Sequence, residues 1–230
     1  VMVERGRRSQ YLQALGIDEW TRRVQPAAES AEATAVDSSN AISTADEWAT
    51  LQQSVASCQR CGLHACRTQT VFGVGDREAE WMVVGEAPGA EEDARGEPFV
   101  GAAGQLLNAM LAAIGLTRES VFIANILKCR PPDNRDPSSA EIAECLPYLH
   151  QQIRQVRPRL ILAFGRVAAQ SLLGTDQPLG ALRGSVHAAP PLNTPVVVTY
   201  HPAYLLRTPA EKRKAWEDLK YARRIHAELR

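Results

Sequence analysis

Four short apolar runs constrain the fold of this chain more than any other feature. Each is rich in branched residues and apolar on both faces, which is typical of parallel strands covered by helices. The runs are WMVVGEAP (81–88), VFIANIL (121–127), LILAFG (160–165) and VVVTYHP (196–202). Segments with helical character occupy 101–116, 138–156, 166–173 and 209–229. This alternation predicts an α/β fold, a three-layer α/β/α sandwich around a central, mostly parallel four-stranded sheet.

The composition changes near residue 46, and this change divides the chain. Residues 24–46 are rich in Ala, Ser and Thr, with four acidic residues and no basic or aromatic one, so they cannot bury enough surface to order themselves. We predict an N-terminal segment with a short helix at 1–23, a flexible linker at 24–46 and a folded domain at 47–230. Within the domain, Ser138 and Glu141 predict a capping box at the start of a helix.

The sequence carries no signal for a membrane. No apolar run approaches the roughly 18 residues that a membrane-spanning helix needs, and no apolar stretch follows the early arginines as in a secretory signal. We therefore expect a cytoplasmic monomer with reduced thiols and no membrane partner. Residues 116–230 carry 17 Lys and Arg against 10 Asp and Glu, which weakly favours a phosphate-bearing partner.

Polar side chains lie where the predicted strands end. Glu86 lies near the end of the first run, in a turn opened by Gly85. Asn125 lies in the second run, and His201 lies near the end of the fourth. Phe99 lies further along the loop that begins at Glu86. A single histidine at a strand end is more often structural than catalytic. Ligands of α/β folds bind beyond the carboxyl ends of the strands, however, so a carboxylate, an amide, an imidazole and a ring there predict one shared binding site.

The five cysteines predict metal or redox chemistry. Cys58 and Cys61 form a Cys-x2-Cys pair, which in a reducing compartment indicates a metal site rather than a disulfide. The other thiols are Cys66, Cys129 and Cys145, and Cys66 lies near enough to the pair to offer a local third ligand. Four thiolates suit either zinc or a [4Fe-4S] cluster, and spacing alone does not choose between them.

These motifs together resemble a known family. The segments GEAPGAEEDARGEPFVGAAGQLLN, NILKCRPPDNRDP, PRLILAFGRVAAQSLLG and VVVTYHPAYLLR are similar, in this order, to the iron–sulfur class of uracil-DNA glycosylases, called family 4. The resemblance covers roughly residues 50–222. It implies a DNA repair enzyme that flips uracil out of DNA and hydrolyses its N-glycosidic bond, leaving an abasic site without a lyase step. It also implies a [4Fe-4S] cluster on Cys58, Cys61, Cys129 and Cys145, with Cys66 left as an ordinary thiol.

The resemblance assigns roles at the strand ends. Phe99 would stack on the flipped uracil, and the Asn125 amide would read its Watson–Crick edge, with Gly85 and Ala87 in the turn beside the base. His201 would donate a hydrogen bond to uracil O2, where negative charge grows as the bond breaks. Glu86 would orient the water or stabilise the sugar cation, or else hold its loop together. Many uracil glycosylases place an aspartate where this chain has Ala87.

Residues after His201 are implied to contact DNA. Leu205 or Leu206 would enter the base stack as the nucleotide leaves it, and Arg207 would meet a phosphate. An ordinary helix packed on the core is the alternative for the two leucines. The N-terminal segment, 1–23, is a candidate docking site for a repair or replication protein.

Two other functions fit the same residues. The first is a uracil-DNA reader with little or no turnover, suggested by Ala87. The second is a zinc-stabilised interaction domain without nucleotide chemistry. Release of free uracil, together with iron content, would separate the three.

Overall fold

The computed structural model describes residues 44–229, and side chains from Glu47 onward. The predicted N-terminal helix, its docking role and most of the predicted linker lie outside the described residues. The first described helix, α2 (Thr44–Ala56), begins inside the range predicted to be linker. In the described part of the chain, no helix is both long enough and apolar enough to cross a membrane.

A six-stranded sheet in the order β1-β3-β2-β4-β6-β5 forms the centre of the domain. Its strands are β1 (Val74–Gly75), β2 (Trp81–Gly85), β3 (Phe122–Asn125), β4 (Leu160–Phe164), β5 (Val186–Ala189) and β6 (Thr194–Thr199). The four central strands are parallel and correspond to the four apolar runs. The prediction of a four-stranded sheet is corrected by two antiparallel edge strands, β1 and β5. β1 has only two residues and β5 is largely exposed, so neither carries an apolar run.

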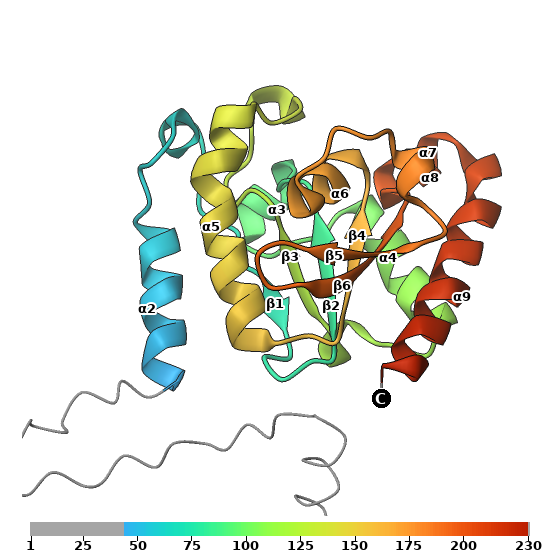
Figure 1. Cartoon of the computed structure of the whole chain (residues 1–230). Coiled ribbons are helices and arrows are strands. Elements are labelled where there is room, and N and C mark those ends of the chain that lie inside the picture. Colours follow the sequence, from blue (N-terminus) through green and yellow to red (C-terminus); the bar gives the residue numbers. More distant parts are fainter. Residues whose placement is uncertain (1–43, 230) are drawn as a thin grey trace, which may run out of the picture. The chain divides into compact units, whose positions relative to one another are not determined.

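Helices pack on both faces of this sheet (Figure 1). Besides α2 they are α3 (Ala90–Arg95), α4 (Ala102–Ala113), α5 (Ser139–Val156), α6 (Arg166–Leu173), α7 (Leu179–Leu182), α8 (Pro202–Arg207) and α9 (Lys212–Glu228). The capping box predicted for α5 is confirmed, because Ser138 and Glu141 exchange hydrogen bonds there. Residues of α2, α5 and α6 share one apolar cluster, and residues of α4, α8 and α9 share the other.

Alternation along each strand divides the core between the two clusters. In β2, Met82 and Val84 face the cluster that contains α2 and α5, whereas Trp81 and Val83 face the cluster that contains α4 and α9. All five β2 residues are buried, as expected for a strand covered on both faces. The runs were therefore apolar throughout because each strand contributes to two layers of core.

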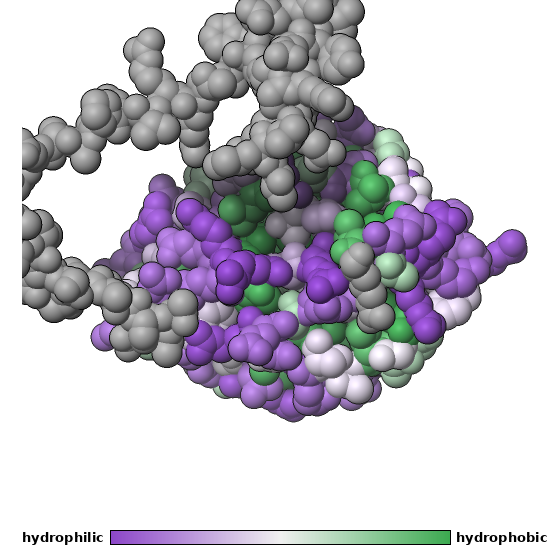
Figure 2. Space-filling model, turned by 60° about the horizontal axis from the view of Figure 1, so that its bottom comes forward, coloured by the Kyte–Doolittle hydropathy of each residue, from purple (hydrophilic) through white to green (hydrophobic). Residues whose placement is uncertain are grey.

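The two ends of the sheet differ in character. The parallel strands point toward the upper edge of Figure 1, where α6, α7 and α8 begin. The lower end, turned forward in Figure 2, shows mostly hydrophilic residues with apolar ones scattered among them. Glu80 and Arg159 lie there, directly before β2 and β4, and form an ion pair at 3.2 Å. The upper end carries the polar strand-end residues, so the site is sought there.

Candidate active site and cysteine site

A cavity of about 600 Å³ opens at the carboxyl ends of the parallel strands. Glu86, Phe99, Asn125 and His201 all line it. They come from the loop after β2, the loop before α4, the end of β3 and the start of α8. The structure therefore brings together the four side chains for which the sequence predicted one shared binding site.

Gly85 lets the ring and the amide approach each other. It pairs with Asn125 across the β2–β3 ladder. A Cβ atom at this position would lie 2.4 Å from Asn125 Oδ1 and 2.5 Å from Phe99 Cζ, well inside contact distance. Any larger residue would push one of the two side chains away. Gly85 thus leaves room for Asn125 and Phe99, which line the cavity, and does not line it itself.

Asn125 presents an unused hydrogen-bonding atom to the cavity. The residue is 2% exposed, and its Oδ1 has no hydrogen-bond partner among the described residues. A buried acceptor in this state costs free energy, on the order of 1–3 kcal/mol, unless a ligand donates to it. Its backbone carbonyl is fixed from the other side by Lys128 Nζ at 2.8 Å. The amide is therefore held ready for a ligand that carries an N–H group.

Phe99 is held in a strained backbone conformation. Its φ of 54° lies in the left-handed region, which is uncommon for an aromatic residue. Arg118 donates to the carbonyls of Phe99 and Pro98. The Glu92 carboxylate accepts hydrogen bonds from the next two backbone amides, those of Val100 and Gly101, at 2.9 and 3.2 Å. These contacts compensate the strain and fix the ring beside Asn125.

His201 is neutral and has a defined tautomer. Its Nδ1 accepts the backbone N–H of Ala203 at 3.2 Å, so the ring proton must lie on Nε2. Burial, aided by the charge of Arg207 and opposed by Glu92, lowers the pKa of His201 to about 4. The ring centroid lies 5.6 Å from that of Phe99. His201 therefore offers a fixed Nε2–H donor near the Phe99 ring.

Glu86 lies in the cavity wall among other charged side chains. Burial raises the pKa of Glu86, the nearby Asp136 raises it further, and Arg166 lowers it. Asp136 and Arg166 form an ion pair with each other at 2.6 Å and line the same cavity. Ala87 also lines the cavity and packs against the core. Glu86 is thus a partly desolvated carboxylate in a charged part of the cavity wall. Asn125 and Phe99 line the same cavity.

The four predicted cluster cysteines border one small pocket. Cys58, Cys61, Cys129 and Cys145 line it, whereas Cys66 is exposed and does not. Arg67 Nη1 donates to Cys129 Sγ at 3.0 Å, and a backbone N–H donates to Cys145 Sγ at 3.2 Å. Hydrogen bonds of this kind stabilise thiolates bound to a metal.

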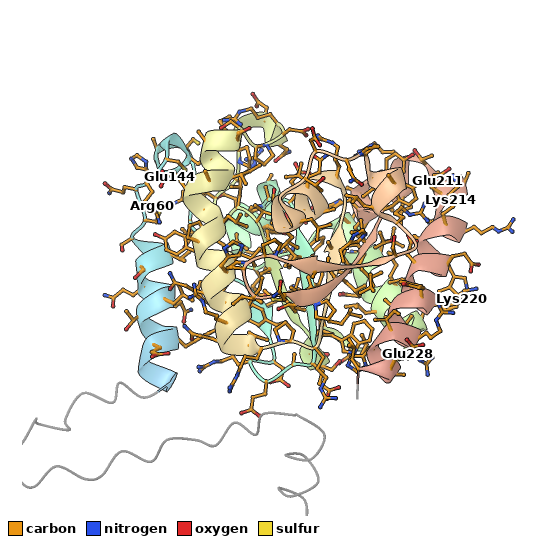
Figure 3. The ribbon with its side chains drawn as sticks, viewed as in Figure 1. Arg60, Glu144, Glu211, Lys214, Lys220 and Glu228 are labelled. Carbon is orange, nitrogen blue, oxygen red and sulfur yellow. The ribbon has the colours of Figure 1, made fainter. Side chains whose placement is uncertain are left out.

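Burial disfavours the thiolate form of two of these cysteines. Burial raises the pKa of Cys145 to about 11 and raises the pKa of Cys129. Within residues 44–229, no group of three or more His, Cys, Asp or Glu side chains is arranged to hold a metal ion. The four-cysteine metal site therefore stays a prediction, and the fit of the residues to it rests on their common pocket and on the N–H donors to sulfur. Arg60 lies between Cys58 and Cys61, and Glu144 directly precedes Cys145 in α5. The two side chains form an ion pair at 2.9 Å and both line this pocket (Figure 3).

Comparison with known proteins identifies the family. The sequence model of the Uracil DNA glycosylase superfamily matches residues 72–220. A type-4 uracil-DNA glycosylase of Archaeoglobus fulgidus is 44% identical over 172 residues, which span 72% of this chain and 86% of the relative. The chain belongs to the type-4 uracil-DNA glycosylases of this superfamily. The resemblance to family 4 is therefore confirmed.

Other type-4 uracil-DNA glycosylases match to a similar extent. The protein of Pyrobaculum aerophilum is 43% identical over 175 residues, covering 74% of this chain and 89% of the relative. The protein of Thermotoga maritima is 38% identical over 180 residues, covering 75% and 91%. The similarity to type-4 enzymes thus extends over most of the described domain.

The two leucines predicted to contact DNA occupy different environments in this type-4 chain. Leu205 is 1% exposed and belongs to the apolar cluster with α4 and α9. Leu206 is 44% exposed, and Arg207 lines the cavity. Leu205 is therefore a core residue, and Leu206 is the exposed leucine of the two.

Several residues of the site lie outside the sequence prediction. Glu92 clamps the Phe99 loop, the Asp136–Arg166 pair lies near Glu86, and Tyr204 lines the cavity beyond His201. Glu92 was visible only as part of an acidic run, and a run of acids is usually a solvated surface. The other contacts join distant segments, so no local pattern could have indicated them.

Proposed function

We propose that this chain removes uracil from DNA by hydrolysing the N-glycosidic bond, releasing uracil and leaving an abasic site. The observation that carries the proposal is the buried Asn125 Oδ1, without a partner among the described residues, beside a ring and a histidine donor in one cavity. The names of the type-4 relatives support the same activity. The base must leave the duplex to reach such a pocket.

Base reading falls to Phe99 and Asn125. A uracil stacked on the Phe99 ring would present its N3–H to Asn125 Oδ1 and its O4 to the amide NH₂. Cytosine has an acceptor at N3 and a donor at position 4, so both hydrogen bonds would be lost and the buried amide would stay unpaired. Rejection of cytosine thus follows from the same unsatisfied atom.

Bond cleavage is assisted by His201. Negative charge develops on uracil O2 as the glycosidic bond breaks, and the fixed Nε2–H of a neutral imidazole would donate to it. The lowered pKa keeps the His201 ring neutral at physiological pH. The neutral ring already carries the Nε2 proton that it would donate. Its donor is already oriented before the substrate arrives.

Glu86 is the group that we assign to the water or to the sugar cation. The carboxylate lines the cavity, and burial keeps it poorly solvated. A desolvated carboxylate attracts a positively charged sugar strongly and accepts a hydrogen bond from water. Leu206 would fill the gap that the flipped nucleotide leaves, and Arg207 would hold a neighbouring phosphate.

The cysteine pocket would hold a [4Fe-4S] cluster through Cys58, Cys61, Cys129 and Cys145. The cluster would supply a structural crosslink between the segment that follows α2 and the segment that follows β3. It would leave the chemistry of the base to the residues of the cavity.

The decisive experiment measures free uracil released from an oligonucleotide with one uracil. We expect the wild-type chain to release uracil and leave an alkali-labile site without cutting the strand itself. Asn125→Ala should lose about 10–100-fold in kcat/KM, the discrimination that a good bidentate base contact provides. Tight binding of the oligonucleotide without any release would instead support a uracil-DNA reader. Equal activity of wild type and Asn125→Ala would contradict the assigned reading role.

A further inference from the structure

Arg183, directly after α7, is the centre of a buried polar network. Its Nε and Nη2 donate to the two carboxylate oxygens of Asp218 in α9 at 2.7 and 3.0 Å. Its Nη1 donates to the Tyr200 hydroxyl at 3.2 Å. Thr199 Oγ1 donates to the same Asp218 carboxylate at 2.8 Å. The network thus connects α7, α9 and the end of β6.

This network grips the two residues that precede His201. Thr199 is the last residue of β6 and Tyr200 follows it, so both are bonded within the network immediately before the histidine. The Arg183 guanidinium also lies 4.3 Å over the Tyr200 ring. That ring stacks on Tyr204, in the first turn of α8, with centroids 5.2 Å apart. The backbone is therefore held on both sides of His201.

The Arg183–Asp218 pair differs from ordinary core packing because it is buried, charged and fixed by directional hydrogen bonds. The side chains of Arg183 and Asp218 are only 14% and 3% exposed. A buried ion pair rarely stabilises a fold more than apolar residues of the same volume would, because both charges lose their hydration. A bidentate pair with two further hydrogen bonds does, however, fix positions closely. An oxyanion donor depends on such positioning, since a displacement of about 1 Å costs on the order of 100-fold in rate.

We propose that Arg183 and Asp218 are positioning residues for the His201 donor. This inference rests on the proposed function and adds two residues to it that do not touch the base. Because His201 would act on charge that appears only in the transition state, displacing it should lower kcat and leave KM nearly unchanged.

The test is Asp218→Asn, which keeps the shape of the side chain and removes its charge. We expect kcat for uracil release to fall about 10–100-fold, with KM within about twofold of wild type. Glu217→Gln is the matched control, because it removes a carboxylate charge in the same way one residue away on α9. Glu217 is exposed and pairs with Lys220, which lies on the outer side of α9 in Figure 3. The control should retain wild-type kcat.

A double-mutant cycle separates positioning from general loss of structure. In a His201→Ala background, Asp218→Asn should lower kcat by no more than about twofold, because the donor that it positions is gone. A full additional loss in that background would overturn the proposal, as would wild-type kcat in Asp218→Asn itself. If Asp218→Asn does not fold, Thr199→Val takes its place, because it removes the hydroxyl that donates to the Asp218 carboxylate. Its kcat is compared in the wild-type and His201→Ala backgrounds in the same way. Wild type and Glu217→Gln release uracil in every case unless the proposed function itself is wrong.

Discussion

The cavity at the strand ends and the cysteine pocket differ in how they satisfy their polar atoms. Asn125 and Cys129 are four residues apart in sequence, yet Asn125 Oδ1 has no partner among the described residues while Cys129 Sγ accepts from Arg67. Cys145 Sγ likewise accepts a backbone N–H. The cavity therefore keeps a buried acceptor available, whereas two sulfurs of the pocket already accept hydrogen bonds from the chain itself.

One residue belongs to both regions. The backbone N–H of Lys128 donates to Cys145, and its buried Nζ donates to the carbonyl of Asn125 and to Gln152. A change on the cysteine side should therefore reach the reading amide through this residue. The comparison predicts a strong, direct effect at His201 in the cavity and a weaker, transmitted effect from the pocket.

The largest effect is expected at His201. His201→Ala removes the only donor assigned to the departing uracil anion, so kcat should fall about 10²–10³-fold. Single-turnover release of uracil from an oligonucleotide measures it. The control His150→Ala changes a histidine on α5 that does not line the cavity, and it should leave kcat near wild type. A His201→Ala protein with more than about a tenth of wild-type kcat would remove the histidine from the mechanism.

A smaller, transmitted effect is expected at Cys145. Cys145→Ser removes a proposed cluster ligand, so iron content and absorbance near about 400 nm should be lost, and kcat/KM should fall about 10–100-fold. Cys66→Ser makes the same change at an exposed thiol outside the pocket and should alter neither. Wild-type iron content in Cys145→Ser, or loss of iron in Cys66→Ser, would contradict the assigned ligand set.

The sequence could predict the parts of both regions that depend on order along the chain. Four apolar runs correspond to the four parallel strands, and strand polarity alone brings Asn125 and His201 to one edge. It could not predict β1 and β5, because edge strands are short or exposed and carry no apolar run. The Arg183–Asp218 pair was equally hidden, since it joins side chains 35 residues apart.

The local sequence pattern also could not predict which of Leu205 and Leu206 is buried. The two are chemically identical neighbours, and only the direction in which α8 packs decides that one is buried and the other exposed. Helix α8 has six residues, too few for its apolar periodicity to be read from the sequence. The structure resolves this choice because the partners of Leu205 come from α4 and α9.

A moderate effect is therefore expected at Leu206. Leu206→Ala should slow release from duplex DNA by about tenfold and change release from single strands less, because only the duplex has a stack to fill. Leu205→Ala should instead lower the free energy of unfolding by about 2–5 kcal/mol, the range for a buried leucine. Rates on paired duplex and single-stranded oligonucleotides, with denaturant melts of both variants, measure the difference. Equal slowing on both substrates by Leu206→Ala would refute the wedge.

The smallest effect concerns the pH dependence of stability that His201 contributes to the cavity. The pKa of His201 is lowered from its ordinary 6.5 to about 4 by burial, so the unfolded chain binds a proton at a higher pH than the folded chain does. The contribution of His201 to stability is therefore fully present above about pH 6.5 and is lost as pH falls toward about 4. His201→Gln should lose less stability than wild type between about pH 7 and about pH 4.5 in denaturant melts. Acid effects on carboxylates and on the cysteine pocket are common to both proteins and cancel in this difference, so identical losses would mean that the ring takes up a proton in the folded state as readily as in water.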